Sequence, residues 1–362
     1  MPEIDKRLRQ YEFSGHIFIF HAYDVGDDIN LDKVKEEQLL VRRPLVLSKY
    51  FKNYHIPIAV ELPHPHMSSR LVSAKLHNFG VITLAYKIPF TQTFEELRAD
   101  ISNIEDEYLE QSVIDAGSVY KRIKKEVKQA KFFHLRKSYV VIQVDPDSEN
   151  SDTVAFKQNY GNDIASILRF ETETLSEYQK NEILESAMGY YRGDLIIIDT
   201  EAAFVYGYEF EDIMDLFEFA NMQQLELQYF DRVLDQQLNS VYEREIKRLP
   251  FTSYLPFFGA VTNDPVGDLG KLKVDISVIT ERLENSIKLS GEAYYSEVFS
   301  VLTEKLDIAQ WKESIHRKLD IIIDIRTVYE NKVDAVREDL LSVLIIVLIF
   351  IEMTVGILHY LK

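Results

Sequence analysis

Histidine and carboxylate side chains are the residues of this sequence that could bind a metal ion. His64 and His66 stand two positions apart, and imidazole nitrogens are common zinc ligands. The 362-residue chain has no cysteine, and no HExxH spacing completes a set of ligands around this pair. The acidic loop from Asp145 to Asp152 lacks the glycine and the final glutamate of a calcium-binding loop. We therefore predict no metal site and no cofactor.

Motifs for nucleophilic catalysis and for phosphate binding are also missing from the sequence. It contains no GxSxG, no GxxxxGK[ST] and no GxGxxG, the patterns that expose a serine on a sharp turn or wrap backbone amides around a phosphate. No residue can therefore be given a catalytic role, which favours a protein without enzymatic activity. The alternative is an enzymatic or ligand-sensing domain whose pocket lies between two α/β units.

The densest run of basic residues lies between positions 121 and 128. A helix is predicted over residues 94–131, with a break or bend near Gly117. Helical spacing places four lysines on one face of it: Lys121, Lys124, Lys125 and Lys128. This face could contact anionic lipid headgroups or RNA, or it could simply be solvated. The formal net charge of −18 repels phosphate backbones, so we do not expect direct binding to nucleic acid.

Glu352 and His359 are the two ionisable residues of an otherwise apolar stretch, residues 340–361. A carboxylate near the middle of a bilayer costs on the order of 3 kcal/mol on insertion scales, so Glu352 needs a partner. We predict that it forms a hydrogen bond or an ion pair between helices, in a homo-oligomer or with another membrane protein. The alternative is a protonated acid that faces lipid. His359 lies seven residues later, on the same face of the helix.

The stretch that positions these two residues is long and apolar enough to cross a membrane. Its 22 residues would span about 30 Å at a helical rise of about 1.5 Å per residue. This predicts a single-pass membrane protein anchored by its C-terminal helix, and a helix buried in a soluble core is the alternative. Lys332 and Arg337 precede the stretch and Lys362 follows it, a bias that places the bulk of the chain in the cytoplasm.

The segment before the anchor repeats apolar residues at the spacing of a coiled-coil seam. Steps of three and four separate its members, which is typical of helices that pack along one face. The seam consists of Ile315, Leu319, Ile322, Arg326, Tyr329, Val333, Val336 and Leu340. One continuous helix is expected to run through the seam into the anchor. It could pair with the preceding helix as an antiparallel hairpin, or with a second copy of itself.

Strand and helix patterns alternate through the rest of the chain, which predicts a fold of the α+β class. Runs at residues 13–23, 71–89, 138–145 and 194–207 are predicted to form strands, and the second and fourth runs contain turn residues typical of hairpins. The predicted domains are an N-terminal α/β unit (1–131), a second α/β unit with a long acidic helix (132–250), a hinge rich in proline, glycine and aromatic residues (251–268), a helical-hairpin stalk (269–339) and the transmembrane helix (340–361). The sequence leaves open whether the two hairpins belong to one sheet.

The C-terminal half of the chain resembles a known family. The tail VLIIVLIFIEM, which contains Ile351 and Glu352, follows a helix bearing RTVYENKVDAVRED. This combination is similar to the C-terminal signature of the required-for-meiotic-nuclear-division family, and the hairpin at residues 194–207 with the long helix after it also resembles that family. The resemblance implies a membrane-anchored α/β and helical protein with no established catalytic activity, and mitochondrial relatives that support organellar translation at the inner membrane.

These patterns together predict a tail-anchored protein that acts as a non-enzymatic scaffold or assembly factor. The α/β module and the helical stalk would carry its contacts. Its expected partners are the membrane and either a second copy of the chain or another membrane protein.

Overall fold

A computed structural model describes most of the chain. The described residues are 10–45, 57–63, 70–132, 136–147, 152–208, 210–245 and 293–360, with five single positions between 273 and 281. The chain divides into two compact units. Unit 1 contains Met1–Tyr229 and Thr280–Trp311, and unit 2 contains Phe230–Ile279 and Lys312–Lys362.

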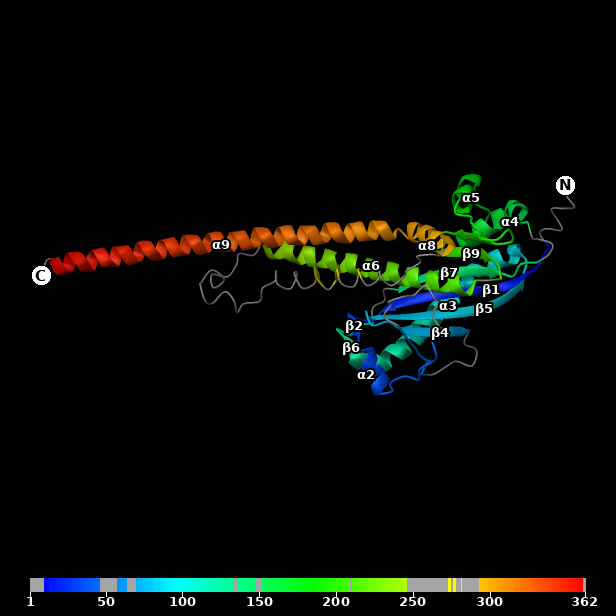
Figure 1. The fold of residues 1–362 in the computed structure, drawn as a ribbon, viewed down its shortest axis with the longest axis horizontal. Coiled ribbons are helices and arrows are strands. Elements are labelled where there is room, and N and C mark those ends of the chain that lie inside the picture. The colour runs from blue at the N-terminus through cyan, green and yellow to red at the C-terminus, as the bar shows by residue number, and fades with distance from the viewer. Residues whose placement is uncertain are drawn as a thin grey trace. The chain divides into compact units, whose positions relative to one another are not determined.

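A mixed sheet forms the centre of unit 1 (Figure 1). β1 (Phe13–Asp24) pairs antiparallel with β5 (Val81–Gln92) on one side and with β7 (Arg136–Val144) on the other. The other strands are β3 (Ile58–Ala59), β4 (Leu71–Leu76), β8 (Leu195–Ile198) and β9 (Ala202–Tyr206), and their order is β3-β4-β5-β1-β7-β9-β8. Both predicted hairpins form, as β4–β5 and β8–β9. Because β1 and β7 lie between them, the hairpins share one seven-stranded sheet, and the α+β class is confirmed.

The composition of β1 explains why this strand lies inside the sheet. From Ile17 to Asp24 every residue of β1 is buried. Successive side chains of a strand point to opposite faces, so a strand that is apolar at consecutive positions needs cover on both faces. Ile17, Ile19 and Tyr23 belong to one hydrophobic core, whereas Phe18 and Phe20 point to the other face of the sheet.

Helices cover both faces of the sheet. α3 (Phe94–Ile123), α4 (Thr153–Leu168) and α5 (Glu177–Leu184) supply buried residues to the core that contains Ile17. α6 (Glu211–Glu245) covers the opposite face, where Phe217 stacks on Tyr139 with ring centroids 5.4 Å apart. The side-chain amide of Asn221 donates to the carbonyl oxygens of Phe20 and Lys137, at 3.4 and 3.2 Å. α8 (Ala293–Lys305) packs against β8.

Local residues determine where α3 begins, and tertiary contacts determine where it ends. Thr93 and Glu96 form a capping box, in which each side chain accepts a hydrogen bond from the other residue's backbone N–H. The helix continues through Gly117 without a break and ends at Ile123, so the predicted extension to residue 131 is wrong.

Beyond α3 the chain enters η1 (Lys124–Glu126) and then β6 (Val127–Lys128), which pairs with β2 (Asp28–Ile29). These long-range backbone bonds replace the helical bonds that the local sequence would otherwise support. α2 (Leu31–Glu36) follows β2.

Two long helices make up most of the described part of unit 2. α9 (Ile308–Tyr360) is one uninterrupted helix of 53 residues, as the sequence predicted, and it begins in unit 1. Within unit 2 the Lys318 ammonium lies 2.7 Å from carboxylate oxygens of both Asp231 and Asp235, and the Ser314 hydroxyl donates to Asp231. Figure 1 shows that α6 and α9 run in the same direction here. Most of residues 269–292 of the predicted helical-hairpin stalk lie outside the described residues, so the antiparallel hairpin stays a prediction.

Replacing either of two glycines in unit 1 with alanine should change the free energy of unfolding, in opposite directions for the two positions. Gly80 in the β4–β5 turn has φ +91°, and a Cβ there would overlap the carbonyl oxygen of Gly26. Gly80→Ala should therefore lower the free energy of unfolding by about 2 kcal/mol or more. Gly117 is helical with open space around its Cβ position, so Gly117→Ala should raise that free energy by about 0.5–1 kcal/mol. Denaturant unfolding of the full chain in detergent measures both, and a stable Gly80→Ala variant would contradict the turn geometry.

Candidate functional site

The apolar C-terminal part of α9 is the first candidate for a functional element. By length and composition Glu338–His359 could cross a membrane, and within the described structure none of its apolar window is buried. Glu352 and His359 are both exposed on it, and no described residue pairs with the Glu352 carboxylate. The Thr354 hydroxyl is satisfied within the helix, because it donates to the carbonyl of Phe350 at 2.6 Å. Length and composition therefore make this segment a candidate for a membrane-spanning helix.

The residues of the predicted seam fall into two groups. Ile315, Leu319 and Ile322 are buried and Leu340 is half-buried. The side chains of Arg326, Tyr329, Val333 and Val336 lie outside the described residues. The polar contacts around the buried group join α9 to α6. Pairing of the seam with a second copy therefore stays a prediction.

The four lysines of the basic run do not share one helix. Lys121 lies in the last turn of α3, Lys124 and Lys125 lie in η1, and Lys128 lies in β6. The helical spacing that grouped them is therefore wrong for Lys128. All four side chains are exposed, and their contact with an anionic surface stays a prediction.

The predicted histidine pair and hinge cannot be placed. His64, His66 and the hinge at residues 251–268 lie outside the described residues. In the part of the chain that the structure describes, no group of three or more histidine or carboxylate side chains could hold a metal ion.

A buried ion-pair network between the sheet and α6 was not predicted from the sequence. The Lys75 ammonium on β4 lies 2.6 Å from a carboxylate oxygen of Glu218 on α6 and 3.6 Å from Asp215. The Thr83 hydroxyl donates to the other oxygen of Glu218 at 2.7 Å, and His77 lies 3.1 Å from that hydroxyl. A lysine inside the apolar strand LVSAKL was the available signal, since a buried lysine needs a carboxylate partner.

The pKa values of this network follow from pairing that outweighs burial. Burial by itself lowers the pKa of Lys75, but the carboxylates of Glu218 and Asp215 raise it above the usual value. Burial raises the pKa of Glu218, but Lys75 and the Thr83 hydroxyl hold it below the usual value. Burial lowers the pKa of His77 to about 3, so this imidazole is neutral at pH 7. The network is therefore charged at Lys75 and Glu218 and fixes α6 on the sheet.

Two further carboxyl groups are buried where β1 ends under α6. Burial, reinforced by the negative charge of Asp27, raises the pKa of Asp24 to about 7, although the backbone N–H of Gly26 donates to this side chain and acts in the opposite direction. Burial, followed by the charges of Asp24 and Asp27, raises the pKa of Glu226 well above its usual range. Oδ2 of Asp24 is buried without a hydrogen-bond partner. Burial therefore disfavours the charged form of both acids.

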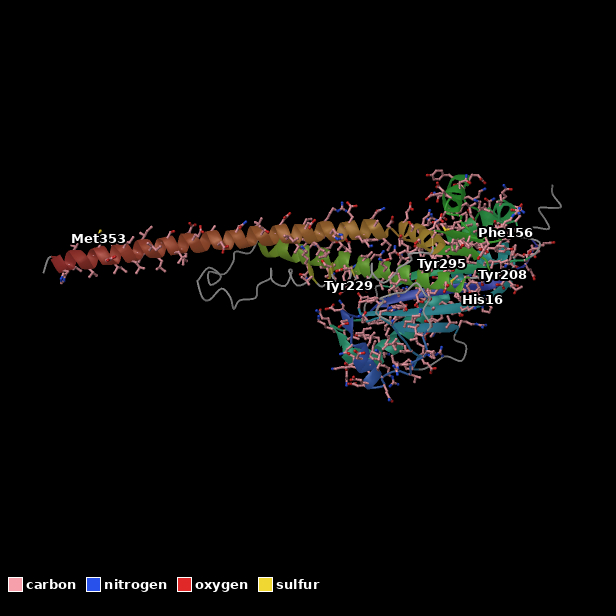
Figure 2. The ribbon with its side chains drawn as sticks, in the orientation of Figure 1. His16, Phe156, Tyr208, Tyr229, Tyr295 and Met353 are labelled. Carbon is pink, nitrogen blue, oxygen red and sulfur yellow. The ribbon has the colours of Figure 1, made fainter. Side chains whose placement is uncertain are left out.

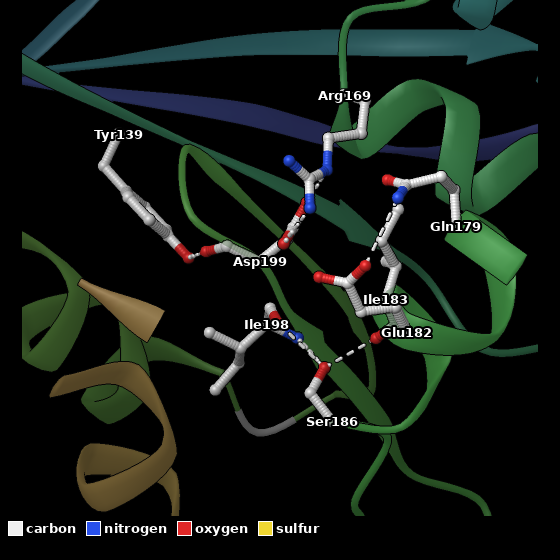
Figure 3. Close-up of polar contacts among 8 residues, drawn as sticks. All are labelled: Tyr139, Arg169, Gln179, Glu182, Ile183, Ser186, Ile198 and Asp199. Carbon is white, nitrogen blue, oxygen red and sulfur yellow. Dashed lines mark hydrogen bonds and ion pairs between the residues drawn. The ribbon is translucent and has the colours of Figure 1, made fainter. Parts of the chain in front are cut away.

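Polar groups also tie α4 and α5 to the edge of the sheet (Figure 3). Arg169 forms an ion pair with buried Asp199, and its Nη2 donates to Asp199 Oδ1 at 3.2 Å. The Tyr139 hydroxyl donates to the backbone carbonyl of Asp199 at 2.9 Å. The Ser186 hydroxyl accepts from the Ile198 N–H at 3.0 Å and lies 2.7 Å from the Ile198 carbonyl. These contacts hold β8 and its turn in place.

A polar cluster under α3 contains a buried histidine. Nδ1 of His21 lies 3.0 Å from the Ser138 hydroxyl. The Tyr86 hydroxyl donates to Asp115 at 2.7 Å, and the Tyr86 ring meets the His21 ring edge to face. Burial and the charge of Arg136 lower the pKa of His21 to about 3. The ring is therefore neutral, and no carboxylate among the described residues forms a hydrogen bond that would orient it as a catalytic base.

A more exposed histidine lies at the end of the sheet where β7 and β9 finish. Nδ1 of His16 lies 3.1 Å from Oε1 of Gln143, whose Nε2 donates to Asp145 Oδ1 at 2.9 Å. Gln143 is completely buried, His16 is half-buried and Asp145 is exposed. Figure 2 labels His16 and Tyr208, which both lie toward this end of the sheet. Gln143 is the one polar residue in the strand run YVVIQV, and that break in the pattern was the available signal.

Sheet and helices together define unit 1 as a mixed α+β domain, followed in this chain by an apolar C-terminal helix. The family described as "Uncharacterized protein MJ0711, N-terminal domain" matches residues 14–212. The chain belongs to this family. The match runs from β1 to the start of α6 and therefore lies within unit 1.

An uncharacterised protein from Methanocaldococcus jannaschii, MJ0711, is similar to this chain. The two are 24% identical over 212 residues, which is 58% of this chain and 63% of that relative. The chain thus matches less than two thirds of the length of the relative. No solved structure matches.

The resemblance of the C-terminal half to the required-for-meiotic-nuclear-division family is wrong. The family match covers residues 14–212, in the N-terminal part of the chain, and the tail with Ile351 and Glu352 lies outside it. Apolar membrane-type helices draw on few residue types, so they resemble one another without common descent. The expectation of mitochondrial relatives depended on this resemblance, so it has no remaining support.

Asp24 provides a prediction about pH. An aspartate with a folded-state pKa of about 7 and an unfolded-state value near 3.8 favours the folded state at low pH. That contribution is lost as the pH rises from about 4 through 7. Asp24→Asn keeps an acceptor for the Gly26 N–H and removes the ionisation. It should therefore raise the free energy of unfolding by about 3 kcal/mol more at pH 8 than at pH 4.5.

Denaturant titrations of the full chain in detergent at both pH values measure this difference. Asp32→Asn, at an exposed position, is the control and should show little change between the two pH values. An equal effect of Asp24→Asn at pH 4.5 and pH 8 would contradict a raised pKa.

Proposed function

We propose that this protein is a membrane-anchored, non-enzymatic scaffold or assembly factor. Glu338–His359 would hold it in a bilayer, while unit 1 and the helices of unit 2 would carry contacts with other proteins. The observation that carries the proposal is that this apolar segment has no cover within the described structure.

The energetics of the segment support anchoring. Val343, Ile346 and Leu358 are each at least 60% exposed, and burying such a side chain contributes about 1.5–3 kcal/mol. A helix of this length spans about 30 Å, which matches the hydrocarbon core of a bilayer. Lipid therefore supplies the apolar environment that the described protein does not. The basic residues before the segment, Lys332 and Arg337, favour a cytoplasmic location for unit 1.

Glu352 supports an assembly role within the membrane. A carboxylate placed near the centre of a bilayer is unfavourable by about 3 kcal/mol unless it is paired. A second copy of α9 would bring a second Glu352 to the same depth, and a protonated carboxyl on one helix can donate to the other. The proposed assembly is therefore a homo-oligomer, with another membrane protein as the competing partner.

Cysteine labelling tests the anchor and its orientation, because the chain has no native cysteine. One variant carries Tyr178→Cys, an exposed position in unit 1, and the other carries Lys362→Cys. A membrane-impermeant maleimide should label intact cells at position 362 alone, and permeabilised cells at both positions. Release of the protein from membranes at high pH, with no labelling of intact cells, would rule out the anchor.

Glu352→Leu tests the assembly role. If interhelical pairing of the carboxyl groups contributes about 1–2 kcal/mol, the variant should insert normally and self-associate about tenfold more weakly. Analytical ultracentrifugation in mild detergent measures the distribution of oligomers. Met353→Leu, on the adjacent helical position labelled in Figure 2, is the control and should behave like the native chain. An unchanged distribution for Glu352→Leu would remove the assembly role.

A further inference from the structure

The end of the sheet near His16 holds three side chains linked in a fixed order. Gln143 is fully buried, and a buried amide is unfavourable unless both its oxygen and its nitrogen are hydrogen-bonded. Both are used here, the oxygen by Nδ1 of His16 at 3.1 Å and the nitrogen by Asp145 at 2.9 Å. His16 comes from β1 and Gln143 from β7, so the link crosses the junction of these neighbouring strands.

The direction of these bonds determines which nitrogen of His16 carries its proton. A carboxylate can only accept, so Asp145 must face the NH₂ group of Gln143. The amide oxygen of Gln143 then faces His16, and it can only accept from Nδ1–H. In the neutral ring the Nε2 atom therefore has a free lone pair, on the side away from Gln143. No residue in the described part of the chain forms a hydrogen bond to this nitrogen.

A lysine lies on the same face of the sheet. Phe18, two positions after His16, shares its face of β1 and is opposite Lys87 of β5 in the strand register. The Lys87 ammonium lies 5.3 Å from the centroid of the Phe18 ring and 5.9 Å from that of Phe210. The rings of His16 and Phe18 are 6.1 Å apart. No described carboxylate forms an ion pair with Lys87, so its three N–H donors are available.

We propose that this end of the sheet binds a small oxyanion that carries its own hydroxyl group. The ammonium of Lys87 would attract the negative oxygen atoms, and Nε2 of His16 would accept the hydroxyl proton. The Nε2 lone pair of His16 would repel an oxygen that carries no proton, so the site disfavours an oxyanion without a hydroxyl to donate. This site is independent of membrane anchoring and goes beyond the scaffold role, because it lies in unit 1 within the residues that match the family.

Inorganic phosphate and sulfate distinguish this site from a general affinity for anions. Near pH 7 phosphate carries at least one P–OH group, whereas sulfate has a similar shape and no proton. Calorimetric titration of the full chain in a maltoside detergent, at constant ionic strength, should give phosphate a dissociation constant about tenfold lower than that of sulfate. Tenfold is the preference expected from one additional hydrogen bond. Equal affinities, or no binding of phosphate, would overturn the proposal.

Nuclear magnetic resonance tests the protonation of His16 directly. In protein labelled with ¹³C and ¹⁵N at histidine, the ring shifts of His16 should report Nδ1–H and an unprotonated Nε2 at pH 8, and phosphate should shift the Nε2 signal. His16→Asn identifies the signals by their loss. A ring protonated at Nε2 in the native chain would overturn the proposal, whatever the titration shows.

Variants separate the two parts of the site. Asp145→Ala, at an exposed position, frees Gln143 to turn, so Nε2 of His16 should gain a proton and the preference for phosphate over sulfate should fall toward one. Lys87→Met should weaken phosphate binding and leave the protonation of His16 unchanged. Tyr208→Phe removes a hydroxyl that donates to the Pro146 carbonyl at the same end of the sheet, and as the matched control it should change neither. If Asp145→Ala kept the preference for phosphate over sulfate, the hydrogen bonds from Asp145 through Gln143 to His16 would not select the ligand.

Discussion

The pairing of β1 with strands on both sides is the interaction on which unit 1 depends. β1 bonds to β5 along its whole length and to β7 over residues 15–23. Both neighbours follow β1 in the sequence by more than 50 residues, so this pairing is long-range and closes two loops of chain at once. The alternation of β1 then sends Ile17 and Ile19 into one core and Phe18 and Phe20 into the other. The positions of His16, His21 and Asp24 follow from the same alternation.

The second face of the sheet is covered by a helix whose buried surface is partly polar. Lys75, Thr83 and Glu218 form a network in which both charges are paired, and Asn221 donates to two carbonyl oxygens of the sheet. A buried ion pair contributes little net stability, because its attraction is offset by the loss of hydration, but an unpaired partner is strongly unfavourable. Any other position of α6 on the sheet would leave Lys75 or Glu218 buried without its partner. The network therefore mainly makes other positions of α6 unfavourable. The position of α6 in turn determines where the chain leaves unit 1.

The family match and the apolar helix concern different parts of the chain. Residues 14–212 belong to the family, whereas Glu338–His359 lies beyond the matched residues. Whatever property this chain shares with its family is therefore located in unit 1, on the sheet and the helices around it. Anchoring by α9 would place that domain at a membrane surface and would not by itself define its chemistry. The proposed oxyanion site near His16 belongs to the shared domain, and the proposed assembly through Glu352 belongs to α9.

Sequence alone determined the elements whose signals are local. The strand pattern of β1, the two hairpins and the unbroken helical pattern of α9 each depend on neighbours within a few positions, and all were predicted correctly. The apolar composition of the tail is equally local. It carries little information about ancestry, which is why the family inferred from it was wrong.

Tertiary structure alone decided how these elements meet. It placed both hairpins in one sheet, ended α3 at Ile123 through pairing of β6 with β2, and brought Lys75 to Glu218 across 143 positions of sequence. It also joined His16 to Gln143, which is 127 positions away. Each of these outcomes depends on strand register and helix docking. Those are selected by the total free energy of burial and hydrogen bonding in the folded chain, and no local pattern of residues encodes that sum.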